Sequence, residues 1–435
     1  MSDRVDATDG RRQLARDAVV WGLPLVLFGR YLDAAVANGV RFNHFYMSSD
    51  VATPRSRAIG PNIDTMNGRA WIDLEEEPQV IGVPATADRY YTIQLQDMYM
   101  NSFAYVGRRT TGTAAGWFVL TPPGFSGRLP EGVTEVRAPT TKVLAFVRTL
   151  VRGSGDLDAV RAINGAFTLG PLSRFPEGQT AATVGAEALD VFQPSSRRTG
   201  GALPHIEIAR SGAAYFAELD RLTHQFPPLD RDAPNLARLT PLDLGAGEAA
   251  HADLAGDVEG AVDLITKSVR SWSENGWLRR SNVAQFIADP LERAANHIYG
   301  PGTQVAEESV FYNLRKGPDG ETLNGAKTYR LRFGPGELPP VDAFWSLTLY
   351  DGNYFLFDNP IDRYGVNDRT EGLRFEDDGS LEILVQPDPP AAGTANWLPG
   401  PPGDFQLVFR TYQPRQPVLD GSYRLPPLDI VGGAE

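Results

Sequence analysis

The chain has 435 residues, 42% of them hydrophobic, which is enough for two or three domains and too apolar for a disordered chain. It has no cysteine, so disulfides, thiolate metal sites and a cysteine nucleophile are excluded. The formal net charge of −13 argues against a nucleic-acid surface, because phosphate binding needs a concentrated basic field.

The N-terminal segment, residues 1–45, is predicted to be helical. Apolar residues recur at helical spacing over residues 11–38, and Pro24 interrupts the pattern. There is no apolar secretory signal, and the longest apolar stretch is far short of a membrane span. We therefore expect a cytoplasmic protein with no membrane or nucleic-acid partner; the sequence leaves a homo-oligomer open.

Residues 46–155 read as a first β unit, because short β-like runs alternate there with Gly/Pro turns. The same pattern returns over residues 328–435 and predicts a second β unit. With antiparallel turns throughout, a jelly-roll-like β-sandwich is the expected form of each unit.

Between them, residues 156–327 are predicted to form a helical and loop connecting region. Amphipathic stripes indicate helices around residues 206–225, 258–272 and 283–298, all expected to pack on a core. The fold class is therefore mixed α and β: two jelly-roll-like antiparallel β-sandwich units joined by a mostly helical middle segment.

The two β units match one another in sequence at three places, in the same order. The matches are YYTIQLQD (90–97) with FWSLTLYD (344–351), Arg109-Thr110 with Arg369-Thr370, and FVRT (146–149) with VFRT (408–411). One match could arise by chance, but three in order favour an internal duplication.

The same motifs carry a family resemblance. Residues 60–65 (GPNIDT), 89–97 and 107–112 (GRRTTG) resemble the bacterial domain of unknown function 1254. Residues 344–351, 358–364 (DNPIDRY), 368–370 and 395–399 (ANWLP) resemble its usual C-terminal partner, domain of unknown function 1214. The resemblance implies two β-sandwich units joined by helices. The family has no settled general activity that the resemblance could imply for this chain. Many relatives begin with an export signal, which this chain lacks. Met66 stands where an aromatic residue is common, which would mark a changed pocket.

Known catalytic signatures are largely absent. There is no Gly-x-Ser-x-Gly elbow, no phosphate-binding Gly-x-x-x-x-Gly-Lys loop and no His-Glu-x-x-His. The five histidines lack ligand spacing, so a histidine metal centre is not expected, and only His44, near the first motif, merits attention. No cofactor is expected; a Ca²⁺ or Mg²⁺ ion held by Asp64 stays open on weak support.

Asp97 and Asp351 each end an apolar strand face in the repeated motif. Such a carboxylate has a raised pKa unless it is paired, and could then act as an acid or base. The alternative is structural: Asp97 would pair with Arg109, and Asp351 with Arg363 or Arg369. Because both units keep these residues, we favour the structural role.

Polar residues found in only one unit are the better candidates for function, because loops on a rigid scaffold often hold ligand groups. The candidates are Asn62, Asp64 and Thr65 in the first unit and Arg363, Tyr364, Asn396 and Trp397 in the second. Aromatic faces beside such polar groups suit a carbohydrate, and arginine suits a carboxylate or phosphate. An Asx-turn at Asn62 and a packed Trp397 are the structural alternative.

These residues predict a cofactor-independent enzyme that uses acid–base chemistry, namely hydrolysis, elimination or cyclisation, on a polar small molecule or carbohydrate. Asp64 would be the acid or base, Arg363 or Arg109 the anion stabiliser, and Tyr364 a proton donor. Asn62, Thr65, Asp97, Asp351, Arg369, Asn396 and Trp397 would bind the substrate. The alternatives are a non-catalytic carbohydrate or small-molecule binding protein and a purely structural or partner-binding role.

Overall fold

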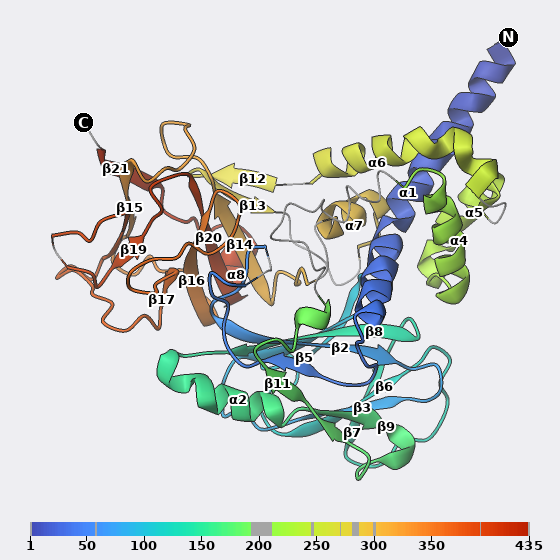
Figure 1. Cartoon of the computed structure of the whole chain (residues 1–435), viewed down its shortest axis with the longest axis horizontal. Coiled ribbons are helices and arrows are strands. Elements are labelled where there is room, and N and C mark those ends of the chain that lie inside the picture. Colours follow the sequence, from blue (N-terminus) through green and yellow to red (C-terminus); the bar gives the residue numbers. More distant parts are fainter. Residues whose placement is uncertain are drawn as a thin grey trace.

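The computed structural model describes eight stretches of the chain. They are residues 2–56, 59–192, 211–244, 248–269, 271–280, 287–298, 302–391 and 393–433. Within them, strands form four sheets, accompanied by several helices, so the predicted mixed α and β class is confirmed. Figure 1 shows the first unit below, the second unit to the left, and the helices gathered around α1 (Ser2–Ala37).

The first unit contains two sheets, with strand orders β11-β1-β2-β8-β4-β5 and β10-β9-β3-β6-β7. The strands are β1 (Tyr46–Ser48), β2 (Thr65–Asp73), β3 (Gln79–Val83), β4 (Tyr91–Gln96), β5 (Ser102–Gly107), β6 (Gly116–Thr121), β7 (Val133–Arg137), β8 (Lys142–Leu150), β9 (Thr168–Pro171), β10 (Thr180–Ala181) and β11 (Thr183–Gly185). Apolar side chains from both sheets meet in one core, among them Ile81, Ile93 and Phe118.

The second unit also contains two sheets, ordered β12-β13-β14-β20-β16-β17 and β19-β18-β15-β21. The strands are β12 (Ser271–Glu274), β13 (Trp277–Arg280), β14 (Ser309–Leu314), β15 (Lys327–Phe333), β16 (Val341–Asp351), β17 (Gly365–Asn367), β18 (Leu381–Gln386), β19 (Trp397–Pro399), β20 (Phe405–Pro414) and β21 (Leu428–Gly433). Its core likewise draws on both sheets, with Leu331, Trp345, Ile383 and Phe409 as members.

Strand β8 is buried along its whole length because both of its faces are covered. Val143 and Ala145 point into the core of the first unit. Leu144 and Phe146, on the opposite face, belong to the core that forms around α1. Further along this second face lies the other unit, so the end of β8 faces an interface between units.

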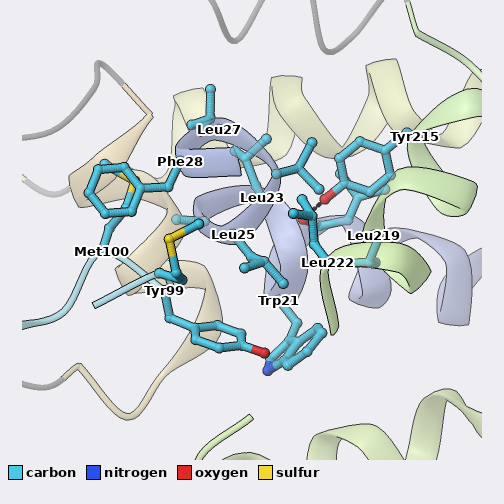
Figure 2. Packing of buried hydrophobic residues seen from close by; sticks show 14 of the residues in the cluster. Trp21, Leu23, Leu25, Leu27, Phe28, Tyr99, Met100, Tyr215, Leu219 and Leu222 are labelled. Atoms are coloured by element: carbon cyan, nitrogen blue, oxygen red, sulfur yellow. Dashed lines mark hydrogen bonds between the residues drawn. The ribbon is translucent and has the colours of Figure 1, made fainter. Parts of the chain in front are cut away.

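Four of the other helices, α4 to α7, pack around α1. Their bounds are α4 (Ala214–Gln225), α5 (Ala233–Leu239), α6 (Ala255–Lys267) and α7 (Pro290–His297). Helix α2 (Leu157–Gly165) packs on β8 and β11, and α8 (Gln416–Leu419) packs on β20. Figure 2 shows Trp21 and Leu25 of α1 packed beside Tyr99 of the first unit and Leu222 of α4. This helical core therefore joins α1 to the β4–β5 turn.

Glycine allows α1 to approach α4 closely. A Cβ at Gly22 would lie 2.4 Å from Leu219, and one at Gly29 would lie 2.7 Å from Leu222. The Asp9–Ala37 part of α1 is long and apolar enough to cross a membrane, by length and composition only. Of its most apolar window, 72% is buried inside the protein, as expected of a core helix.

The middle of the chain is less helical than its periodicity predicts. Helix α6 ends at Lys267, and Trp272 of the predicted 258–272 stripe lies in β12 instead. The predicted helices over 206–225 and 283–298 correspond to α4 and α7, and their first residues lie outside the described stretches. Six strands, β9 to β14, fall within this segment and extend the sheets of both units. Helical periodicity is a property of neighbouring residues, so it cannot reveal strand pairings between segments far apart in the sequence.

Two of the three sequence matches lie in paired strands, and they are also matches of strand register. In the first unit Tyr91 pairs with Thr149 across the β4–β8 ladder. In the second unit Trp345, which is 254 positions after Tyr91, pairs with Thr411, which is 262 positions after Thr149. The two central ladders are thus built in the same way, and residues can be compared between units position by position.

Candidate functional site

The two units meet along a seam of aromatic and aliphatic side chains. It is defined by Tyr90, Leu150, Phe344 and Tyr412. Tyr90 corresponds to Phe344 and Leu150 to Tyr412 at the offsets given above, so each unit contributes the same two positions. Phe344 stacks on Tyr412 with ring centroids 4.1 Å apart, and Tyr90 meets both rings edge-on. We call this contact the inter-unit seam.

An ion pair crosses the seam at each end. Arg369 of the second unit donates from Nη2 to Asp64 Oδ1 of the first unit at 2.9 Å. Arg109 of the first unit donates from Nε to Glu308 Oε2 of the second at 2.6 Å. Both carboxylates are almost fully buried, with residue exposures of 1% each. Each unit therefore holds the other through an arginine and a buried acid.

Strand register shows that Asp64 and Glu308 are counterparts. Asp64 precedes the residue that pairs with Leu150, and Glu308 precedes the residue that pairs with Tyr412. The carbonyl of Asp64 accepts from the amide of Val151 at 2.9 Å, as that of Glu308 does from Gln413. The expectation that Asp64 has no counterpart in the second unit is therefore wrong. The match was hidden because an Asp is replaced by a Glu outside the conspicuous motifs.

The two ends of the seam differ in the residue that precedes the arginine. Asp368 precedes Arg369 and forms an ion pair with Arg369 Nη1. At the matching position Arg108 instead donates to Gln413 Oε1 at 2.6 Å and pairs with Asp88. Only the Arg369 end thus has two carboxylates on one guanidinium.

At the Arg369 end of the seam, the three charged side chains extend from the protein interior toward the surface. The side-chain exposures are 0% for Asp64, 15% for Arg369 and 31% for Asp368. Burial raises the pKa of Asp368 to about 6, and the negative charge of Asp64 adds to this rise against the opposing effect of Arg369. An acid with that pKa can give or take a proton near neutral pH.

Further contacts keep this end in place. Arg369 lies over the ring of Phe344, with Cζ 4.4 Å from the ring centroid. Asn367 Nδ2 approaches Asp64 Oδ1 at 3.4 Å. The second carboxylate oxygen of Asp64, Oδ2, is buried and accepts no hydrogen bond from the described residues.

Asn62 and Thr65 shape the loop that carries Asp64. Asn62 Oδ1 accepts from the amide of Asp64 at 2.7 Å, which is the Asx-turn considered as the structural alternative. Asn62 Nδ2 also donates to the hydroxyl of Tyr412 at 2.8 Å, across the seam. The Thr65 hydroxyl bonds to Asn67 at 3.1 Å. The neighbouring Met66 lies in a small buried apolar cluster.

Asp97 and Asp351 build the same turn in the two units. Asp97 Oδ1 accepts from the amides of Tyr99 and Asn101, two and four residues on. Asp351 Oδ1 accepts from the amides of Asn353 and Phe355, again two and four residues on. The predicted pairings of these carboxylates with Arg109, Arg363 or Arg369 are wrong, because amides of the adjacent turn satisfy Oδ1.

The residues predicted between positions 363 and 397 hold a loop together. Arg363 Nη1 donates to the carbonyls of Ala395 at 3.1 Å and of Trp397 at 2.9 Å. Asn396 donates from Nδ2 to the carbonyl of Arg374 and accepts at Oδ1 from the amide of Arg374. Trp397 is buried and donates from Nε1 to a backbone carbonyl. The polar side-chain atoms of these three residues thus form hydrogen bonds with backbone groups of the second unit.

Two other candidates take no part in the seam ion pairs. The hydroxyl of Tyr364 donates to Asp362 at 2.9 Å, and burial together with Asp362 raises the pKa of Tyr364 to about 12. His44 is buried, and its Nε2 lies 2.8 Å from the Thr183 hydroxyl. Burial and the nearby Arg41 lower the pKa of His44. Of the predicted residues, the structure thus brings Asn62, Asp64 and Arg369 together.

Sequence reasoning missed Asp368 and Glu308. Asp368 stands inside the family-like motif next to the repeated Arg-Thr, and its asymmetry against Arg108 was a visible signal. Glu308 lies ahead of a strand that local pattern did not reveal. No three or more His, Asp or Glu side chains within the described stretches are grouped as a metal site would require.

Comparison with known proteins places these features in a family. Residues 42–171 match the family model "Protein of unknown function (DUF1254)", and residues 308–416 match "Protein of unknown function (DUF1214)". The chain carries one domain of each family, in the N- to C-terminal order that its motifs predicted. Nothing among the curated proteins matches the sequence.

Two solved structures resemble the chain over most of its length. The VPA0106 protein from Vibrio parahaemolyticus is 20% identical, with a TM-score of 0.73, and the similarity covers 97% of this chain and 100% of that one. A putative uncharacterized protein from Burkholderia cenocepacia is 13% identical, with a TM-score of 0.44, over 98% and 96% of the two chains. The first of these establishes a shared fold and nothing about activity.

Proposed function

We propose that the chain is a cofactor-independent enzyme that applies acid–base chemistry to a polar small molecule or carbohydrate at the Arg369 end of the seam. The observation that supports it is the arrangement of Asp368 and Asp64 on the two terminal nitrogens of Arg369. The scaffold repeats the ion pair at both ends, but adds the second carboxylate at one end only. Stability alone therefore gives no reason for Asp368.

In this proposal Asp368 exchanges the proton. It is the carboxylate nearest the surface, and a pKa of about 6 leaves both of its protonation states populated near neutral pH. Arg369 fixes its orientation, and the charge of Asp64 contributes to its raised pKa. Hydrolysis, elimination and cyclisation all need a proton given or taken at such a group.

The finer fold prediction also stands as a proposal. Each unit would be a jelly-roll-like antiparallel β-sandwich, and the two units would be joined by a mostly helical middle segment. The shared core of the two sheets in each unit and the packing of α4 to α7 on α1 support this arrangement.

The test is turnover and binding across a panel of glycosides, phosphate esters and hydroxy acids, with wild type, Asp368→Asn and Asp64→Asn. We expect Asp368→Asn to lower kcat about 100-fold or more with little change in ligand affinity. The wild-type rate should bend near pH 6, and this bend should be missing in Asp368→Asn. Unchanged turnover in Asp368→Asn would remove it from the proposal.

Two variants serve as controls. Glu308→Gln changes the counterpart of Asp64 at the other end of the seam, and Glu371→Gln removes an exposed acid three residues after Asp368. Neither should alter the pH profile. Binding without turnover would instead support the non-catalytic binding protein, and neither binding nor turnover across the panel would contradict both.

A further inference from the structure

The first unit contains a hollow far from the seam ion pairs. Its volume is about 440 Å³, and it lies where β2 turns into β3, beside β9 and the loop after α1. It is lined by Phe42, Asn43, Asp73, Glu75, Glu76, Glu77, Gln79, Leu169, Gly170, Pro171 and Thr180. Four of these residues are acidic and none is basic, so we call it the acidic hollow.

An ammonium group already binds at its margin. Lys142 Nζ lies 2.8 Å from Asp73 and 2.7 Å from Glu75, and the lysine side chain is only 7% exposed. The same nitrogen lies over the ring of Phe42, 5.5 Å from its centroid. Two carboxylates and an aromatic face around an ammonium are the chemistry by which proteins recognise amines. The chain thus contains an internal example of the recognition it could offer to a ligand.

Gln79 adds a hydrogen-bond acceptor to the lining of the hollow. Gln79 is 4% exposed, and its Nε2 donates to the Glu77 carbonyl at 3.3 Å, which fixes the direction of the amide. Its Oε1 is buried and accepts no hydrogen bond from the described residues. An unmet buried acceptor is costly, and a donor in the hollow would relieve that cost.

The carboxylates leave negative charge uncompensated. Lys142 neutralises one of the four acids, so the lining retains an excess of three negative charges. Glu77 accepts from the amide and hydroxyl of Ser173, which holds it in place without neutralising it. Glu76 is exposed at the mouth. The ligand should therefore be a cation that donates hydrogen bonds at more than one point.

We propose that the acidic hollow binds a linear organic polyamine. One ammonium would reach the Gln79 Oε1 and Glu77, and a second would lie at Glu76. The volume suits an extended molecule better than a single ion, and the apolar lining from Leu169 and Pro171 suits its methylene chain. This site is independent of the seam and of the activity proposed there.

Calorimetry with the whole protein at 150 mM salt tests this, using spermidine, butylamine and Mg²⁺ as separate probes. We expect spermidine to bind at least 10-fold more tightly than butylamine. Gln79→Leu and the double variant Glu76→Gln/Glu77→Gln should each weaken spermidine about 10-fold or more. Circular dichroism should show that these variants remain folded.

Glu131→Gln, an exposed acid elsewhere in the first unit, is the matched control and should leave the affinity unchanged. Three results would overturn the proposal: no spermidine binding, an equal loss in Glu131→Gln, or Mg²⁺ binding as tightly as spermidine. If Gln79→Leu unfolds, Gln79→Glu provides the second measurement. It adds an acceptor charge and should tighten spermidine binding, whereas unchanged affinity would contradict the role of Gln79.

Discussion

At one end of the seam Arg109 binds a buried Glu308, and at the other Arg369 binds a buried Asp64. The two ends use equivalent positions of a duplicated unit, and both tie one unit to the other. They differ because Asp368 stands where the first unit has Arg108. The comparison teaches that the ion pair present at both ends belongs to the scaffold. Asp368, which is present at one end only, is not needed for that scaffold and can have a functional role.

The largest effect should come from breaking either ion pair on its arginine side. Arg369→Ala and Arg109→Ala each leave a buried carboxylate without its cation. Each substitution should therefore lower the free energy of unfolding by about 3–5 kcal/mol. Urea denaturation measures this. Arg137→Ala, in a pair whose arginine side chain is 73% exposed, is the control and should cost about 1 kcal/mol or less. A cost below about 1 kcal/mol at either seam arginine would contradict the scaffold role.

The repeated turns allow a second comparison, which depends on pH. Burial raises the pKa of Asp97 to about 6 from 3.8, so the folded protein binds this proton more strongly than the unfolded chain. The stability of the wild type should therefore fall, relative to Asp97→Asn, as pH rises from about 4 to 6. The expected total is on the order of 3 kcal/mol.

Denaturation of Asp97→Asn and wild type across that pH range checks the sign. Asp351→Asn is the matched variant for the turn itself, because Asp351 Oδ1 accepts from the equivalent pair of amides in a half-buried position. A wild type that instead gained stability relative to Asp97→Asn over this range would contradict the buried-carboxylate account.

The hydrogen bond between Asn62 and Tyr412 should contribute less. Tyr412→Phe removes the hydroxyl that accepts from Asn62 Nδ2, and should cost about 1 kcal/mol. In the Asn62→Ala background the same change should cost clearly less, because its partner is already gone. Equal costs in both backgrounds would show that the bond does not contribute to stability.

The smallest effect on stability is expected at Asp368. It lies near the surface beside an ion pair that persists without it. At about pH 4, where the carboxyl of Asp368 is mostly protonated in the folded protein, Asp368→Asn should change the free energy of unfolding by about 0.5 kcal/mol or less. Because burial raises the pKa of Asp368, any change should favour the variant as pH rises through about 6. A loss of several kcal/mol would make Asp368 part of the scaffold and weaken its proposed role in chemistry.

Much of the architecture could be predicted from the chain. The repeat was visible because Tyr91 and Trp345 lie in segments of the same alternation, and in the structure each pairs with its partner strand in the same register. The family and its order also followed from the motifs. The extra strands of the middle segment could not be predicted, because short strands such as β11, which pairs with β1, form through partners distant in sequence.

The candidate site was only partly predictable. The sequence identified Asp64 and Arg369 as candidate site residues. It did not predict that they form an ion pair, because 305 positions separate them. Trp397 and Arg363 looked like ligand groups because their types suit binding, yet their polar atoms satisfy backbone carbonyls of their own unit. Residue type cannot distinguish these two uses of the same hydrogen-bonding group.

By itself, the sequence determined that two related β units exist and which segments form their central strands, because alternation and turn residues act over a few neighbouring positions. Only the tertiary structure decided that the units face one another, that Glu308 is the counterpart of Asp64, and that Asp97 binds its own turn. These are outcomes of burial: a carboxylate removed from water must find a cation or an amide, and the packing of the whole chain determines which one is within reach.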